Sequence, residues 1–150
     1  MNNEKQVKAL NDLLAKCYDA EKGFKEAAED VKSDNLKQMF REYATQRFNF
    51  GHELKGLIRN FGGDPDKGDT IAAKMHRAWM DLKSAVASNE EKNILEEVVR
   101  GEENALEHYQ EALDELDPGS IAFNTVVNQR NQIRSVITRV KNLLPAYAES

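Results

Sequence analysis

The sequence predicts an all-α protein, organised as a bundle of four long helices. Apolar residues recur every three or four positions along four stretches of about 27 to 30 residues, which is the pattern of an amphipathic helix. No stretch shows the strict alternation of polar and apolar residues that is typical of a half-buried strand. With 150 residues, of which 40% are hydrophobic, the chain is long enough for a buried core, and we expect residues 1–150 to form a single domain.

The first two helices are expected over about residues 3–31 and 35–61. Ser33 or Asp34, in the short break between them, is placed to cap the second helix, since both side chains can accept a hydrogen bond from a backbone N–H of the first turn. The second helix ends at Gly62-Gly63-Asp64-Pro65, a cluster of residues that does not continue a helix.

A connecting segment follows. After a loop over about residues 64–70, a shorter helix is expected over about residues 71–86. We expect this short helix to cover one side or end of the bundle. Its apolar positions are Met75, Trp79, Leu82 and Val86.

Local signals also mark the third and fourth long helices. Ser88-Asn89-Glu90-Glu91 has the spacing of a capping box and predicts the start of the third helix, which runs to Leu116. Asp117-Pro118 then provides an N-cap and a proline at the first helical position. The fourth helix is expected to continue to Leu144, where Pro145 stops it.

The lengths of the connections indicate how the helices are arranged. The first and second helices are joined tightly, as are the third and fourth, whereas about 25 residues connect the two pairs. Short, long, short is the connectivity of a ferritin-like bundle with one crossover. The sequence therefore predicts a ferritin-like four-helix bundle whose long crossover carries an additional short helix.

A single carboxylate interrupts the apolar stripe of two of the helices. Glu21 in the first helix and Glu102 in the third stand where aliphatic residues are expected. An internal repeat places them at equivalent points, and it also aligns Gln46 with Gln132. A carboxylate in a core is costly unless it is paired, protonated or bound to a metal, so each of these glutamates needs a partner.

A metal is one candidate partner. In di-iron bundles two helices each supply one glutamate, and the other two each supply a Glu-x-x-His motif. No Glu-x-x-His motif occurs at any histidine of this chain, which are His52, His76 and His108. The alternative hypothesis is therefore a carboxylate-type site for one or two iron or manganese ions, with Glu21, Glu53 and Glu102 as its ligands.

A network of basic and amide side chains is the other candidate partner. Arg47 faces inward from the second helix, and Arg130 or Arg134 is placed to do so from the fourth. A buried, charge-balanced network of this kind can fix helix register without adding stability over an apolar core. In a smaller form of this network, Glu102 is paired with Gln132 or Tyr109 alone. The full set is Glu21, Gln46, Arg47, Glu102, Arg130 and Gln132.

Composition disfavours several classes of function. The net charge is −5 and no basic cluster occurs, so nucleic acid and anionic membrane surfaces are not expected partners. No apolar run of about 18 residues is present to span a membrane. The N-terminal segment lacks an apolar signal region, so a cytoplasmic location is expected. The only cysteine, Cys17, lies on an apolar stripe and is expected to be a small core residue.

Four segments carry a resemblance to a known family: LNDLLAKCYDAEKGFKEAAEDV, YATQRFNFGHEL, HRAWMDLKSAV and RGEENALEHYQEAL. Over about residues 7–116 the chain resembles a bacterial family of four-helix-bundle proteins whose ferritin-like domain has no assigned function. The resemblance implies a ferritin-like fold in a soluble bacterial protein, with stress response as a candidate role. It implies no catalytic residues and no cofactor.

These observations lead to two hypotheses of function. The first is a non-enzymatic, metal-free bundle that acts as a structural or interaction module, forms a homodimer and has an unidentified protein partner. The second is a carboxylate-type protein that binds iron or manganese through Glu21, Glu53 and Glu102. The two differ in whether an arginine or a metal ion neutralises the glutamates on the apolar stripes.

Overall fold

The structure is a computed structural model, which describes residues 2–74, 79–88 and 90–148. These residues form six α-helices and no strand, so the prediction of an all-α protein is confirmed. The helices are α1 (Asn3–Asp30), α2 (Asp34–Asn60), α3 (Gly68–Lys74), α4 (Met80–Ser88), α5 (Glu91–Asp114) and α6 (Ile121–Ala148). No helix in the described ranges is both long and apolar enough to cross a membrane.

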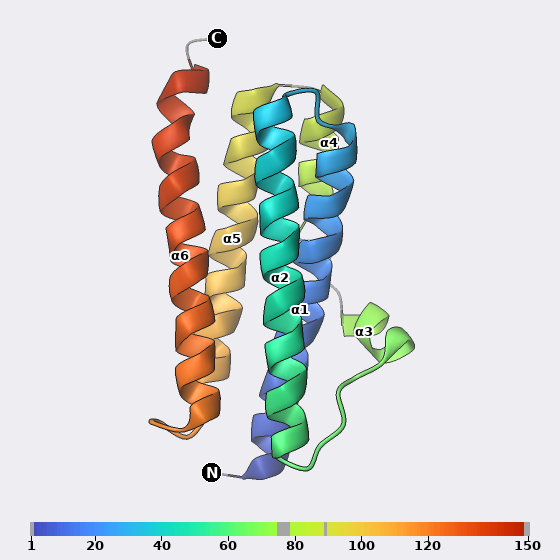
Figure 1. Cartoon of the computed structure of the whole chain (residues 1–150), viewed down its shortest axis with the longest axis vertical. Helices are drawn as coiled ribbons and strands as arrows, with labels where there is room; N and C mark the ends of the chain where they lie inside the picture. Colours follow the sequence, from blue (N-terminus) through green and yellow to red (C-terminus); the bar gives the residue numbers. More distant parts are fainter. Residues whose placement is uncertain (1, 75–78, 89, 149–150) are drawn as a thin grey trace.

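Four long helices, α1, α2, α5 and α6, lie side by side along the long axis of the molecule (Figure 1). α1 and α2 are antiparallel, as are α5 and α6, while α2 and α5 run in the same direction. The segment between α2 and α5 returns the chain from one end of the molecule to the other, with α3 and α4 on the side away from α6. Two helical hairpins thus share one core.

The helix caps explain where α1 and α2 begin. The side chain of Asn2 accepts hydrogen bonds from the backbone N–H groups of Glu4 and Lys5. The hydroxyl of Ser33 accepts one from the N–H of Leu36, so Ser33 caps α2 and Asp34 is its first residue. Such side chains satisfy N–H groups that have no partner within the helix.

An aromatic cluster lies in the core between α1, α2 and the residue directly before α4. The ring of Phe24 on α1 lies 6.1 Å from that of Phe40, 5.5 Å from that of Tyr43 and 4.7 Å from that of Trp79. All four side chains are buried. Because α1, α2 and the segment before α4 each contribute a ring, the cluster joins the first hairpin to the crossover.

The crossover differs from the expected single helix over residues 71–86. Its described residues form two short helices, α3 and α4, and Trp79 lies in a turn directly before α4. The indole of Trp79 packs between α1 and α5, where Gly23 and Gly101 leave room for it: a Cβ at either glycine would lie 2.8 Å from Trp79 atoms. Met75 and His76 are outside the described residues.

Two predicted helix starts are wrong. Ser88 is the last residue of α4, and its hydroxyl donates to the carbonyl of Ala85, so it does not cap α5, whose N-cap is Glu90. Asn89 lies outside the described residues. At α6 the N-cap is Ser120, which accepts from the N–H of Phe123, and Asp117-Pro118 belongs to the preceding turn. Gly119 allows that turn because its φ is +79°.

Pro145 does not stop the last helix. α6 continues to Ala148 with Pro145 inside it. Proline removes one backbone hydrogen bond, here to the carbonyl of Lys141. Both residues are exposed, so water can hydrate that carbonyl and the helix continues for one further turn.

The close approach of Trp79 yields a prediction about glycine substitutions. Gly23→Ala should lower the free energy of unfolding by about 1–3 kcal/mol, because the added Cβ meets the Cβ of Trp79 and forces α1 and the crossover apart. Gly56→Ala is the matched control, since its Cβ meets nothing within 4 Å. In an exposed helix it should raise stability by about 0.5–1 kcal/mol. Urea titrations of both variants check this, and equal effects would contradict it.

Candidate functional site

A buried ion pair lies at the centre of the bundle. Arg47 projects inward from α2 and Glu102 from α5, and their side chains are 2% and 0% exposed. An Nη of the guanidinium donates a hydrogen bond to Glu102 Oε2. Each residue stands on the apolar stripe of its helix, so folding the stripes into one core brings the two charges together.

Aromatic rings enclose the guanidinium. Its carbon lies 5.6 Å from the ring centroid of Phe24 and 5.9 Å from that of Phe50. Both distances allow a cation–π interaction, which is stronger where water is excluded. Arg47 therefore has one charged partner and two aromatic partners in the core.

Burial and pairing act in opposite directions on the pKa of each partner. Burial acts to lower the pKa of Arg47, but the neighbouring Glu102 carboxylate outweighs this and raises it. Burial raises the pKa of Glu102, and Arg47 only partly offsets that effect. Glu102 Oε1 has no hydrogen-bond partner among the described residues. The carboxylate thus depends on one arginine for its stabilisation.

A second polar chain runs beside the ion pair. The hydroxyl of Tyr109 donates to Gln129 Oε1 at 2.7 Å and lies 3.4 Å from the Cys17 sulfur. The Gln129 amide donates to the Phe50 carbonyl and to Glu53 Oε1, both at 3.2 Å. Gln129 is completely buried. This chain links α1, α5, α6 and α2 through neutral groups and ends at an exposed carboxylate.

Neither Cys17 nor Tyr109 is set up as a nucleophile or base. Burial raises the pKa of the Cys17 thiol to about 11, although its hydrogen bond to Tyr109 acts in the opposite direction. Burial also raises the pKa of Tyr109 well above its usual value. Both groups therefore stay protonated near neutral pH, and Cys17 acts as a small core residue.

The structure brings together only part of the predicted core network. Arg47 and Glu102 meet, and Arg47 Nε also donates to Gln46 Oε1 at 3.3 Å. Glu21 is buried near the edge of the core, where Lys25 of the next turn pairs with it at 2.7 Å. Its partner is thus an exposed lysine of its own helix.

The two predicted members from α6 are not in the core. Arg130 is half-buried and donates to its neighbour Asn131 at 3.4 Å, and Gln132 is also half-buried. Gln129 takes the central place instead. It follows Val126 by three positions and precedes Ile133 by four, so the apolar stripe of α6 itself marks Gln129, whereas the repeat alignment pointed to Gln132.

The three glutamates of the metal hypothesis have different partners. Glu21 pairs with Lys25, Glu53 accepts from Gln129, and Glu102 pairs with Arg47. Within the described part of the chain, no three side chains of His, Cys, Asp and Glu are grouped so that they could hold a metal ion. His52 is exposed, and His76 lies outside the described residues.

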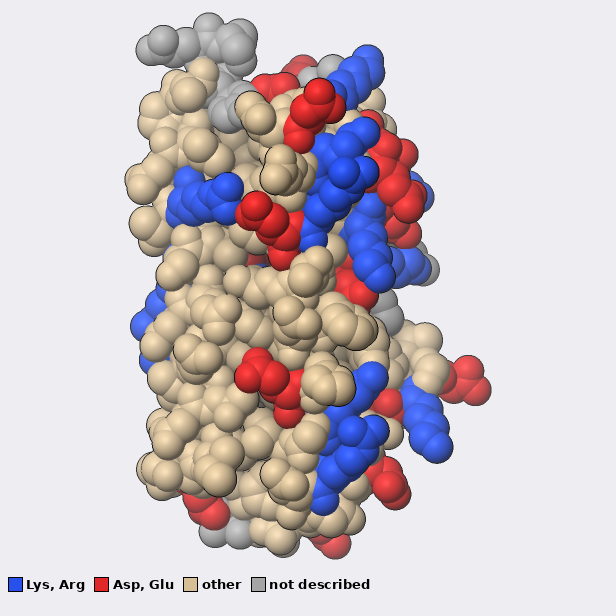
Figure 2. Space-filling model, viewed as in Figure 1, with Lys and Arg blue, Asp and Glu red and all other residues tan. Residues whose placement is uncertain are grey.

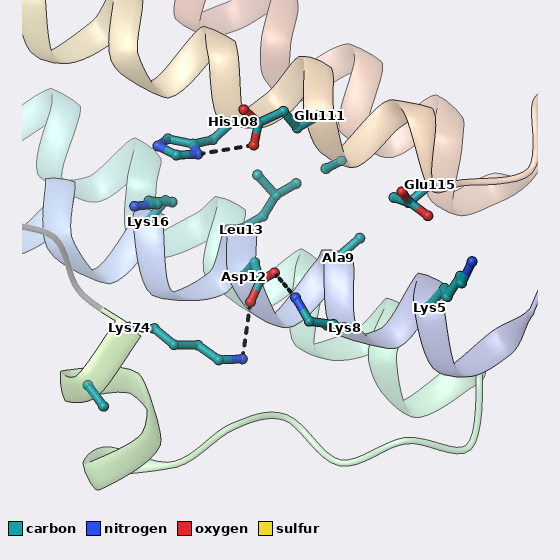
Figure 3. Close-up of a pocket in the computed structure, with 12 residues that line it drawn as sticks. Lys5, Lys8, Ala9, Asp12, Leu13, Lys16, Lys74, His108, Glu111 and Glu115 are labelled. Atoms are coloured by element: carbon teal, nitrogen blue, oxygen red, sulfur yellow. Dashed lines mark hydrogen bonds and ion pairs between the residues drawn. The ribbon is translucent and has the colours of Figure 1, made fainter.

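A groove of about 710 Å³ opens on the surface between α1 and α5, beside α3 (Figure 3). Asp12 is central to it and pairs with Lys8 at 3.0 Å and Lys74 at 3.2 Å. The amine of Lys16 is enclosed here without a hydrogen bond to any described residue, and burial lowers its pKa. Asp12, Asp19 and Glu111 act on Lys16 in the opposite direction. The groove is thus lined by side chains of both charges.

The sequence matches a known protein family. Residues 5–115 match the family model described as "Domain of unknown function (DUF2383)". The chain belongs to this family. The matched segment contains both members of the ion pair, whereas α6 with Gln129 lies beyond it. No curated protein matches the sequence.

The ion pair predicts a graded response to substitution. Glu102→Ala should cost about 3–5 kcal/mol of unfolding free energy, because it leaves the Arg47 charge buried and unpaired. Glu102→Gln should cost less, since the amide oxygen still accepts a hydrogen bond. Denaturant titration measures both.

Glu103, the next residue on α5, provides the control for the Glu102 variants. Glu103 is exposed and pairs with Lys141 at 3.8 Å, with both side chains 57% exposed, so Glu103→Ala should change stability by less than about 1 kcal/mol. Parent-like stability of both Glu102 variants would show that the pair is energetically unimportant.

Asp19 predicts a pH-dependent effect. Burial raises the pKa of Asp19 to about 6, although Lys16 and Lys22 oppose the shift. The folded state therefore binds the proton more tightly than the unfolded state, and the charged carboxylate destabilises the fold above about pH 6. Asp19→Asn should be more stable than the parent at pH 7.5 and lose this advantage near pH 4.

Urea midpoints at the two pH values measure this effect. Glu107→Gln, at an exposed position on α5, is the control and should change little at either pH. An Asp19→Asn advantage that is the same at both pH values would be inconsistent with titration of this carboxyl.

Proposed function

We propose that this member of the family is a non-enzymatic, ferritin-like helical module in which an arginine–glutamate pair takes the place of a di-metal site. The arrangement of the hairpins supports the ferritin-like part of the proposal. α1–α2 and α5–α6 are antiparallel pairs, a long crossover joins them, and α2 and α5 run in the same direction (Figure 1). A bacterial cytoplasm as its setting is part of this proposal and rests on the resemblance in sequence.

The Arg47–Glu102 pair is the observation that carries the proposal. In a carboxylate-type metal bundle, a glutamate at this inward position is a ligand, and the positive charge of the ion stabilises it. Here a guanidinium provides that charge and is itself 2% exposed. A dication beside it would have to overcome like-charge repulsion in a medium of low dielectric constant. Arginine and metal therefore exclude each other at this place.

The chemistry of the surrounding groups agrees with a structural role. The polar chain through Tyr109 and Gln129 is made of neutral hydrogen-bonded groups, and the thiol of Cys17 is held protonated. Such groups specify how helices pack and give no nucleophile or general base. We infer that the protein acts through its outer surface, by binding another protein chain.

Metal retention tests this function. The protein is incubated with ferrous iron, manganese or zinc, desalted, and its metal content is measured by mass spectrometry. The expected result is no retained metal at a fixed ratio to protein, for the parent and for Glu102→Ala alike. Retention of one or two ions per chain by the parent, lost in Glu102→Ala but kept in Glu103→Ala, would overturn the proposal and establish Glu102 as a ligand.

A further inference from the structure

We propose that the chain forms a symmetric homodimer through the outer face of α1 and α2, with Phe48 of each copy inserted into a groove of the other. The inference identifies the interaction surface of the proposed module. It rests on side chains at the surface, so its outcome does not depend on whether the core excludes metal.

Phe48 is the first observation. Its side chain is 56% exposed, and among the described residues only Ile121 is a comparably exposed large apolar side chain. Phe40 and Phe50 of the same helix are buried in the core, whereas Phe48 lies outside the apolar stripe. The core therefore gives no reason for a phenylalanine at this position, and an exposed aromatic side chain is typical of an interface anchor.

A groove beside Phe48 is the second observation. It lies between α1 and α2, has a volume of about 590 Å³, and includes Phe48 in its lining. Ala28 of α1 and Ala44 of α2, each 4% exposed, also line it, and between the longer side chains of the lining they leave space at the helix surfaces. Phe48, as a knob, and the groove between α1 and α2, as the hole, therefore lie on the same face of the molecule.

That combination fits a second copy of this chain better than an unrelated partner. A twofold axis places the knob of each copy opposite the hole of the other, and the same patch then serves both sides of the interface. Insertion of a large apolar side chain of one helix between side chains of another is the usual contact between packed helices.

The charges around the groove are also self-complementary. Glu29 on α1 and Arg41 on α2 line it from opposite walls and are exposed, and neither makes an ion pair with any described residue. In a twofold dimer the Glu29 of one copy can face the Arg41 of the other. Figure 2 shows acidic and basic side chains intermixed along the right of this view, towards α1, and mostly uncharged side chains over its middle and lower left.

A small cavity gives the interface a link to the core. It has a volume of about 50 Å³, and its lining includes Phe48, Glu21, Cys17 and Arg47. Because Phe48 and Glu21 line both this cavity and the groove, a docked partner would cover the side of the bundle on which the cavity borders the buried arginine. The dimer would thus complete the enclosure of the ion pair.

The test is the molar mass in solution. Size-exclusion chromatography with light scattering, over about 1–100 µM protein, should give a mass of about twice the 17.0 kDa of one chain. Phe48→Asp should shift the mass to that of a monomer while the helical circular dichroism is unchanged. Ile121→Asp, at the other exposed apolar side chain, should leave the dimer intact.

A charge exchange tests the orientation. Glu29→Arg and Arg41→Glu should each weaken self-association, and an equimolar mixture of the two variants should restore a dimer of one copy of each. A monomeric parent at 100 µM, or a dimer that survives Phe48→Asp, would overturn the proposed interface. Dissociation by Ile121→Asp instead would assign the contact to α6.

Discussion

A single ion pair in the core constrains the way the two hairpins fit together. Arg47 belongs to the first hairpin and Glu102 to the second, and neither can reach water. Moving α5 by one residue relative to α2 would rotate the carboxylate about 100° around its helix axis and leave the guanidinium unpaired. We infer that the energetic penalty of such misalignments, rather than the net strength of the pair, makes it favour one register. Apolar contacts alone would tolerate several neighbouring arrangements.

The ion pair and the polar groups beside it connect the helices in two different ways. The charges are confined to Arg47 and Glu102, while Tyr109 and Gln129 join the remaining helices by hydrogen bonds between neutral groups. Glu21 avoids the cost of full burial because Lys25 reaches it from the helix edge. At the centre of the bundle the desolvated charges thus form a pair, and the neutral groups beside it add specificity at lower electrostatic cost.

The long helices and the two charged core residues could be predicted from the sequence, because both follow from local or periodic patterns. The long helices follow from apolar spacing, and Glu102 and Arg47 attract attention because each interrupts an apolar stripe. Gln129 was missed because a neutral amide on a stripe is a weaker signal than a charge, and because the repeat aligned its neighbour Gln132 instead. The place of Trp79 in a turn rather than in a helix could not be predicted, because its contacts are with Gly23 and Gly101, and only the folded chain brings those three residues together.

Through Trp79, the crossover also contributes to the packing of the two hairpins that it connects. Its indole packs against α1 at Gly23 and against α5 at Gly101, so one side chain of the crossover bridges the two hairpins. Trp79 is the only tryptophan of the chain. The intrinsic fluorescence of the protein therefore reports on the docking of the hairpins rather than on helix content. Comparing fluorescence with circular dichroism during unfolding would separate the loss of the bundle from the melting of its helices.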